Sequence, residues 1–405
     1  MVTLEQMRAS NARIPECLPP GVVAVFVGGT SGIGEATMKQ LAKYAVQPRI
    51  YFIGRSERAA ARILDELVAI NPAGEYHFLQ ADLSLLQNVD QVCCEIKSRE
   101  SLINLIFLTS GTLVTGKETC EHLYYPTAVT YYARIRLIVN LLPLLQKAPA
   151  LRRVVSVFGG TKEGPVTVGD LQGRSLALPP RSASPKGHRG KDNNNSSSSN
   201  NNSNSNSNNN KSHLLQLRAH TSSMMTLALE SLALEAPDVS FVHSSPGCVR
   251  THLGREVRAA SALGLVQVVL NKVVGPMVAV APDEAGERQL YLATSGRFPP
   301  ARCGGRARYS GGGGGGGGGS GSGGSGSGTG WGTAGVELRE GDGVAVARGT
   351  DARVGSGVYS VDSEGEPQGV KAGETMRRLR EADLVRRLWL HTVGEFVRVT
   401  GTEFV

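Results

Sequence analysis

Residues 22–34 read Val22-Val23-Ala24-Val25-Phe26-Val27-Gly28-Gly29-Thr30-Ser31-Gly32-Ile33-Gly34, and they decide the fold of this 405-residue chain. The first six residues are apolar without interruption, which predicts a buried strand. A glycine-rich turn follows the strand, and a helical segment follows the turn. A strand, a glycine turn and a helix N-terminus in this order form a cradle for the pyrophosphate of a dinucleotide.

Five residues of the turn are the candidates for holding the pyrophosphate: Gly28, Thr30, Ser31, Ile33 and Gly34. Gly28 permits the tight turn, because glycine tolerates backbone angles that other residues avoid. Ser31 and Ile33 offer backbone N–H groups, and Gly34 lets the helix approach the strand. The flanking strand and helix make the motif more specific than a glycine turn alone.

Strands and helices alternate along the next two hundred residues. The predicted strands are 22–27, 49–53, 76–80, 102–108, 153–157 and 239–243, and the predicted helices are 34–44, 57–70, 86–97, 130–145 and 222–235. Continuously apolar strands separated by helices indicate a parallel sheet that is covered on both faces. We therefore predict an α/β fold with a Rossmann-like, doubly wound parallel sheet.

The composition divides the chain into segments. We predict a lead over 1–20, a nucleotide-binding domain over 21–302 with a disordered Asn/Ser-rich insert at 172–212, a flexible Gly/Ser-rich segment over 303–332, and an extension over 333–405 that packs on the domain. Within the extension, Val344–Arg348 and Gly357–Val361 predict a hairpin, and Glu374–Val399 predicts a helix with an apolar side.

The formal net charge of +8 gives little reason to expect a nucleic-acid partner. The segment from Arg174 to Lys211 holds six basic residues and one acid, so five of the eight charges lie in the insert rather than on a folded face. No apolar run approaches the roughly 20 residues that span a bilayer. The six cysteines are scattered without the spacing of a metal site, and residues 1–10 do not resemble a secretion signal. We expect a cytoplasmic protein without metal, membrane or nucleic-acid partners.

The end of the second strand indicates which dinucleotide binds. An acidic residue at this place grips the 2′-hydroxyl of the ribose in NAD sites, whereas arginine accommodates the 2′-phosphate of NADP. Here the sequence is Gly54-Arg55-Ser56, with no acid. Arg55 and Ser56 are therefore the candidates for the 2′-phosphate, and the predicted cofactor is NADP.

Taken together, these residues resemble the short-chain dehydrogenase/reductase family. Ala81-Asp82-Leu83-Ser84 is similar to the family's Asp-Leu pair beside the adenine, and Pro246-Gly247-Cys248-Val249-Arg250-Thr251 matches its Pro-Gly-x-x-x-Thr element. The resemblance implies that Asp82 and Leu83 border the adenine and that Thr251 meets the nicotinamide carboxamide. It implies hydride transfer to or from a carbonyl or alcohol of a small molecule. It also implies a homodimer built on the 130–145 helix.

Four further stretches look like a fungal branch of the family whose members often accompany secondary-metabolite gene clusters. They are Arg153–Val157, Lys162–Gly164, Thr226–Glu230 and Gly357–Asp362. The resemblance therefore extends into the C-terminal extension.

The catalytic residues of the family are not found where the resemblance places them. The family uses an Asn in the fourth helix, a Ser after the fifth strand, and Tyr-x-x-x-Lys in the next helix, where the Lys lowers the phenol pKa. The Asn position falls near Thr130, and the Ser position falls on Phe158-Gly159-Gly160. The Tyr and Lys positions fall near Arg218 and Ser222, or two residues later on His220 and Met224.

Three functions remain open at this point. Substitute groups could serve a working reductase, with His220, Tyr131 or Tyr132 as the proton donor. The fold could instead carry a non-redox isomerase or cyclase. The third alternative is a catalytically degenerate NADP-binding protein, such as a sensor or partner subunit.

Overall fold

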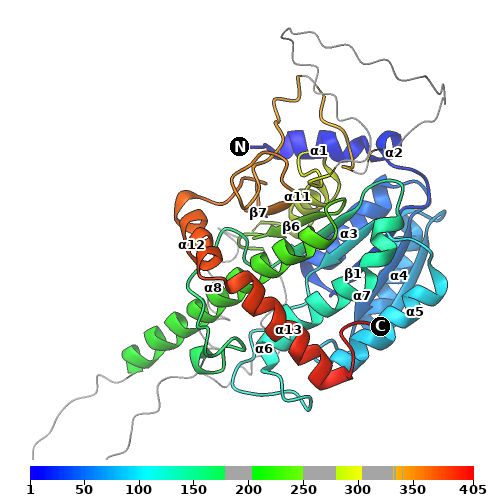
Figure 1. Ribbon diagram of the computed structural model, residues 1–405. Helices are drawn as coiled ribbons and strands as arrows, with labels where there is room; N and C mark the ends of the chain where they lie inside the picture. Colours follow the sequence, from blue (N-terminus) through cyan, green and yellow to red (C-terminus); the bar gives the residue numbers. More distant parts are fainter. Residues whose placement is uncertain (178–202, 250–279, 303–331, 333, 340) are drawn as a thin grey trace, which may run out of the picture.

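A seven-stranded, wholly parallel sheet forms the centre of the molecule (Figure 1). The computed structural model describes residues 1–177, 203–249, 280–302, 332, 334–339 and 341–405. The strand order is β3-β2-β1-β4-β5-β6-β7. The strands are β1 (Val23–Val27), β2 (Arg49–Gly54), β3 (Glu75–Gln80), β4 (Leu105–Leu108), β5 (Arg153–Val157), β6 (Ser240–Ser244) and β7 (Val358–Val361). This is the predicted Rossmann-like, doubly wound sheet.

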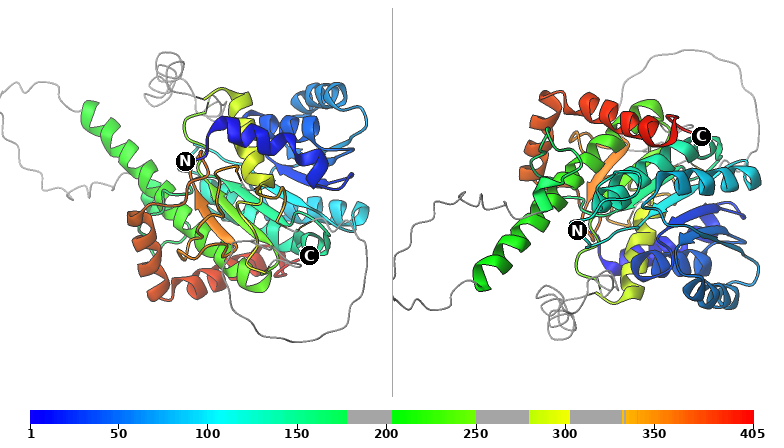
Figure 2. Two further views of the ribbon diagram at one scale, coloured as in Figure 1. Left: turned by 90° about the horizontal axis from the view of Figure 1, so that it is seen from above. Right: turned by 90° about the horizontal axis from the view of Figure 1, so that it is seen from below.

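Helices cover both faces of the sheet (Figures 1 and 2). The helices of the first half are α1 (Leu4–Ala12), α2 (Ile14–Cys17), α3 (Gly32–Tyr44), α4 (Glu57–Ile70) and α5 (Leu86–Arg99). Those of the second half are α6 (Tyr125–Thr127), the π-helix η1 (Ala128–Tyr132), α7 (Ala133–Lys147), the 3-10 turn η2 (Ser175–Ala177), α8 (Ser203–Glu235), α11 (Pro282–Thr294), α12 (Val370–Glu381) and α13 (Leu384–Thr400).

Strand β1 shows why both faces need cover. Val23, Val25 and Val27 point into an apolar cluster that includes side chains of α5, α7, α8 and α13. Ala24 and Phe26 point into the opposite cluster, with side chains of α3, α4 and α11. Every residue of β1 is buried, so the strand is apolar throughout rather than alternating.

The C-terminal extension completes the sheet instead of forming the predicted hairpin. β7 pairs with β6 in parallel, with Phe241 beside Val358 and Ser244 beside Val361. Residues 344–348 do not form a strand, and Arg348 makes only an isolated antiparallel bridge with Val354. The hairpin prediction was wrong because β-type residues in a short segment do not reveal which strand they pair with.

The predicted helix over 374–399 is two helices. Asp383 separates α12 from α13 with a left-handed backbone, φ 55°. The apolar spacing continues across this break, so the sequence pattern did not show it. The N-terminal lead also belongs to the fold, because Asn11 of α1 donates hydrogen bonds to the Glu287 carbonyl and side-chain carboxylate on α11.

The Asn/Ser-rich insert differs in part from the prediction of disorder over 172–212. Ser175–Ala177 form the turn η2, and α8 begins at Ser203, so its first ten residues lie inside the predicted insert. Residues 178–202 lie outside the described part of the chain.

The π-helix η1 and the start of α7 are covered by the chain's own C-terminal helix α13. Tyr131 and Tyr132, directly before α7, share hydrogen bonds with Thr392 and His391 of α13. Arg136 donates hydrogen bonds to Asp90 and to backbone carbonyls of the last residues. Eleven of the fifteen residues of α7 are buried, whereas Val139, Pro143, Gln146 and Lys147 are half-buried or exposed. The homodimer contact that the resemblance implied stays a prediction.

One stretch of the described residues, Tyr125–Lys147, is long and apolar enough to cross a membrane by length and composition. Its most apolar window is 89% buried inside the molecule. Core helices of globular proteins pass the same test, so this stretch is weak evidence for a membrane span.

Because α13 covers part of the core, we expect its buried aromatic residue Phe396 to contribute strongly to the free energy of unfolding. Phe396 is fully buried against the core, with the Arg136 guanidinium 5.2 Å from its ring centre. We expect Phe396→Ala to lower the free energy of unfolding by about 3–5 kcal/mol, because it leaves a cavity. Denaturant titration measures the change. Phe404 is 62% exposed, so Phe404→Ala should stay within about 0.5 kcal/mol of the wild type; equal effects would contradict this role of α13.

Candidate active site

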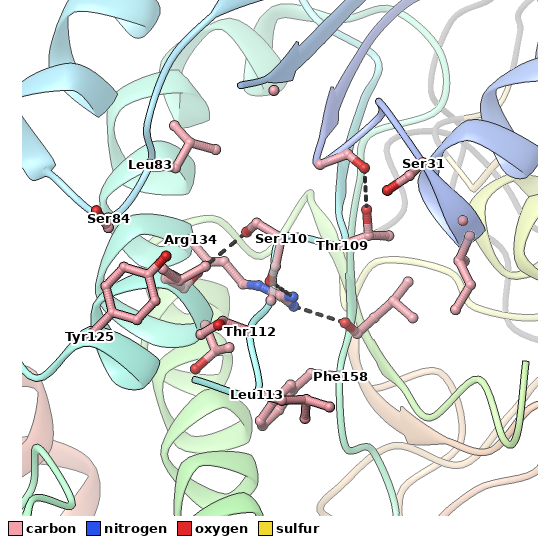
Figure 3. A pocket seen from close by; sticks show the side chains of 18 of the residues that line it. Ser31, Leu83, Ser84, Thr109, Ser110, Thr112, Leu113, Tyr125, Arg134 and Phe158 are labelled. Carbon is pink, nitrogen blue, oxygen red and sulfur yellow. Dashed lines mark hydrogen bonds between the residues drawn. The ribbon is translucent and has the colours of Figure 1, made fainter. Parts of the chain in front are cut away.

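A cavity of about 890 Å³ opens where the carboxyl ends of the central strands meet (Figure 3). Its walls come from the β1–α3 turn, the ends of β2 to β5, the segment 109–115, η1, α7, α8 and the residues after β6. Strand order reverses between β1 and β4, and ligands of doubly wound sheets bind in the crevice at such a reversal. The volume lies within the range of small-molecule and cofactor sites.

The glycine turn forms one wall of this cavity. Gly28 has φ +85°, and a Cβ on it would lie 2.8 Å from the backbone nitrogen of Ser110. A Cβ on Gly34 would lie 2.7 Å from the Gly28 carbonyl oxygen. Both positions therefore exclude a side chain, as the sequence predicted. α3 begins at Gly32, two residues earlier than predicted.

Four of the five predicted turn residues line the cavity: Gly28, Thr30, Ser31 and Ile33. Gly34 is buried and does not line it. Its role is the close packing of α3 against the turn, so that the positive end of the helix dipole faces the cavity.

The other predicted cofactor residues gather at the same end. Arg55, Ser56, Asp82 and Leu83 all line the cavity. The Ser56 hydroxyl accepts a hydrogen bond from the backbone of Ala59 and caps α4. Asp82 accepts a hydrogen bond from the backbone of Ser84, which fixes the loop after β3. Thr251 lies outside the described residues, although Pro246 and Gly247 of its motif line the cavity.

A buried arginine stands at the opposite end of the cavity. Arg134 is 1% exposed, and it donates hydrogen bonds to Ser156 Oγ, to the Val157 carbonyl and to the Ser110 carbonyl. Figure 3 shows it reaching between Ser110 and Phe158. Burial lowers the pKa of the guanidinium to about 9. The sequence pattern offered one signal for it, a basic residue within an apolar helix.

Phe158 occupies the place where the family has its serine. Its ring stacks on His243 of β6, with ring centres 6.4 Å apart. Gly159 donates its backbone N–H to His243 Nε2, so the proton of the imidazole is on Nδ1. Nδ1 donates to Thr226 Oγ1, and the Thr226 hydroxyl donates to Glu163 Oε1.

In this buried chain of hydrogen bonds the imidazole of His243 is neutral, so it does not form an ion pair with Glu163. Burial raises the pKa of the Glu163 carboxyl, and hydrogen bonds from Ser360 and Thr226 only partly oppose it. Burial, with the nearby charges of Arg134 and Arg218, lowers the pKa of His243 to about 3. The network fixes the loop that carries Phe158.

The orientation of helix α8 distinguishes the two alternative places for the family's Tyr and Lys, Arg218 with Ser222 or His220 with Met224. Five of its described residues line the cavity: Leu214, Leu215, Leu217, Arg218 and Thr221. Four of them, all except Leu215, have the spacing of one face of a helix. Arg218 therefore faces the cavity. His220 does not line it, and the second register, with His220 and Met224, is excluded.

His220 is not placed to donate a proton to a substrate. It is fully buried, its Nδ1 accepts the backbone N–H of Thr167, and its Nε2 bonds to the Leu171 carbonyl. Burial lowers its pKa. The prediction of a catalytic His220 was wrong because spacing along α8 does not show which side of the helix faces the cavity.

The prediction of Tyr131 or Tyr132 as the proton donor was wrong for the same reason. Both are fully buried beneath α13, and burial raises the pKa of both phenols. Neither lines the cavity, whereas Tyr125 does. Sequence reasoning missed Tyr125, and no spacing signal distinguished it from its tyrosine neighbours. Thr130, at the Asn position, lines the cavity, and its hydroxyl donates to the Pro126 carbonyl.

Because His243 is buried and neutral, we expect the free energy of unfolding to decrease at acidic pH. Its folded pKa of about 3 lies below the ordinary value of 6.5. Its contribution is therefore fully present above pH 6.5 and is lost as pH falls, because the unfolded chain takes up the proton first. We expect unfolding free energy to fall by up to about 1.4 kcal/mol per pH unit between pH 6 and 4 from this group. Urea titrations across that range measure the slope.

His243→Asn should flatten that slope, even though the variant starts from a lower stability. The matched control is His122→Asn, because His122 is exposed and tolerates the same exchange at its φ of 60°. An unchanged slope in His243→Asn would contradict the assignment of a neutral imidazole.

Comparisons with known proteins agree with this geometry. Residues 22–129 match the family model for short chain dehydrogenases. The chain is 32% identical over 397 residues to an oxidoreductase of Emericella nidulans, covering 97% of each protein. It is 30% identical over 404 residues to an oxidoreductase of Emericella variicolor, covering 99% of each.

A short-chain dehydrogenase/reductase of Stachybotrys chartarum is 27% identical over 316 residues, which cover 73% of this chain and 78% of that relative. Among solved structures, a 3-oxoacyl (acyl-carrier-protein) reductase of Agrobacterium tumefaciens matches with a TM-score of 0.45 and 18% identity over 68% of this chain and 88% of that one. With relatives of this identity along its whole length, the chain belongs to the short-chain dehydrogenase/reductase family.

Proposed function

We propose that this protein is an NADP(H)-dependent oxidoreductase that interconverts a carbonyl and an alcohol on a small metabolite. One observation carries the proposal. A single continuous cavity joins the glycine turn and Arg55 at one end to Tyr125, Arg134 and Phe158 at the other. A protein that only sensed the nucleotide would need no open space beyond the adenine end.

The residues of the cavity suit NADP. The N-terminus of α3, with Ser31, Gly32 and Ile33, presents backbone N–H groups to a pyrophosphate. Arg55 supplies a positive charge after β2, at the place of the 2′-phosphate, and no acid of the described residues lines the cavity beside it except Asp82 after β3. When bound, the cofactor supplies the hydride or accepts it.

The chain's own residues must then hold and protonate the substrate oxygen. Tyr125 is the one tyrosine among the described residues that line the cavity, and Lys117 Nζ lies 3.7 Å from the centre of its ring. The phenol can donate a proton to an alkoxide that forms on the substrate. Tyr125 thus takes the role that the sequence assigned to His220, Tyr131 or Tyr132.

The setting that we infer is the cytoplasm of a fungus and its secondary metabolism. The support is the resemblance of four sequence stretches to a fungal branch, together with the fungal oxidoreductases that match along the whole chain. The substrate itself is a proposal taken up below.

Arg55 provides the sharpest test of the cofactor. Arg55→Glu should weaken NADPH binding at least tenfold more than NADH binding, because a charge-assisted contact becomes a repulsion. Isothermal titration calorimetry with both cofactors measures the ratio. Arg58→Glu, an exposed change of the same charge on α4, should leave the ratio unchanged. Equal losses for both cofactors would refute the 2′-phosphate assignment.

Tyr125→Phe tests the proton donor in a screen of carbonyl compounds with NADPH. We expect kcat to fall by roughly 10²-fold or more with little change in KM, because the proton is transferred in the transition state. The control is the neighbour Tyr124, whose hydroxyl bonds to the backbone of Gly116 and which does not line the cavity. Tyr124→Phe should keep kcat within a few-fold, and equal losses in both variants would exclude Tyr125 as the donor.

A further inference from the structure

The Phe158 end of the cavity holds positive charge that no described acid balances. Arg134 and Arg218 both line the cavity there. The Arg134 guanidinium lies 5.7 Å from the centre of the Phe158 ring, and Arg218 Nη2 lies 3.4 Å from the Phe158 carbonyl oxygen. Both charges lower the pKa of His243, so both are close to the same point.

Arg134 is a buried cation whose described partners are all neutral oxygens: one hydroxyl and two carbonyls. Its Nε is buried and has no hydrogen-bond partner among the described residues. No described carboxylate forms an ion pair with it, and burial is the cause of its lowered pKa. A buried charge without a counter-charge is costly, and a ligand that supplied the opposite charge would offset that cost.

Arg218 adds a second positive charge at this end of the cavity, and solvent can reach it. It is exposed on α8, and its hydrogen bonds to the Phe158 carbonyl and Ser245 Oγ are both long, at 3.4 Å. Arg136 and Arg380 are instead held by the carboxylates of Asp90 and Glu230, whereas the buried Arg153 donates to backbone carbonyls. Among the described residues that line the cavity Asp82 is the one acid, and it lies at the proposed adenine end.

We infer that the substrate carries a carboxylate, which lies against Arg218 and Arg134 at the Phe158 end of the cavity. The inference rests on the proposed function, because the same cavity must hold the cofactor. Around the two arginines the lining includes the apolar side chains of Phe158, Leu214 and Leu217, beside the hydroxyls of Ser110 and Thr221. The substrate class is therefore a carbonyl compound with an apolar body and one carboxylate, and guanidinium groups match carboxylates by paired hydrogen bonds.

The test uses benzoate and its neutral counterpart benzamide as probes of the full chain loaded with NADPH. Calorimetry should show benzoate binding in the ~mM range and benzamide binding at least tenfold more weakly, because only benzoate offers a charge to the arginines. Arg218→Gln should reduce benzoate affinity about tenfold and leave benzamide affinity unchanged.

The matched control is Arg377→Gln, which removes the same charge from an exposed position on α12 paired with Glu381. It should not alter either affinity. Arg134→Met is a weaker test, because loss of its hydrogen bonds to Ser110 and Ser156 can prevent folding. The Arg218→Gln variant is therefore the decisive test of the carboxylate site.

The inference is overturned if the two probes bind equally well, or if benzoate does not bind up to about 100 mM. The proposed function is unaffected by this result as long as NADPH binds. If NADPH added to the unloaded chain displaces benzoate and Arg218→Gln weakens NADPH binding tenfold, the arginines serve the cofactor's phosphates, and the carboxylate site is again refuted. If the unloaded chain prefers benzoate but binds neither cofactor, the proposed function fails, and the assignment of the carboxylate to a substrate fails with it.

Discussion

The close approach of α3 to the end of β1 is the constraint on which the site depends. Gly34 packs so near the Gly28 carbonyl that a single Cβ would collide with it. This contact points the N-terminus of α3 at the crevice between β1 and β4, where the strand order reverses. A bulkier residue at either glycine would move the helix and remove the backbone donors from the cavity. The wall that the glycine turn and the N-terminus of α3 give to the cavity follows from this contact.

The C-terminal extension builds the rest of the domain. β7 adds a seventh strand beside β6, and α13 lies across η1, α5 and α8 (Figures 1 and 2). The buried hydroxyls of Tyr131 and Tyr132 are satisfied by Thr392 and His391, so the extension replaces water as their hydrogen-bond partner. The π-helix η1 and the start of α7, the helix that the resemblance assigned to a second subunit, are covered by α13 of the same chain.

Among the described residues, the cavity departs from the family pattern at the end where we propose that the substrate reacts. The pyrophosphate turn and the residues after β2 and β3 keep the family's pattern, whereas Thr130, Phe158 and Arg218 stand at catalytic positions. Phe158 and Arg134 replace a serine hydroxyl with an aromatic ring and a buried positive charge. A site with this charge favours oxyanions, both on a substrate group and on an oxygen that becomes negative during the reaction.

The sequence by itself determined the parallel sheet, the glycine turn and the place of Arg55, because these depend on local patterns: apolar runs, glycines at fixed spacing and the residue that ends a strand. It could not determine which sides of η1 and α8 face the cavity. Tyr131, Tyr132 and His220 were chosen by residue type and spacing, yet they face the core, while Tyr125, Arg134 and Arg218 face the cavity. Only the tertiary structure decided this, since the rotation of a buried helix is set by what packs on it. Here the packing partners are α13 and the 158–171 loop, which are far from these helices in sequence or follow no periodic pattern.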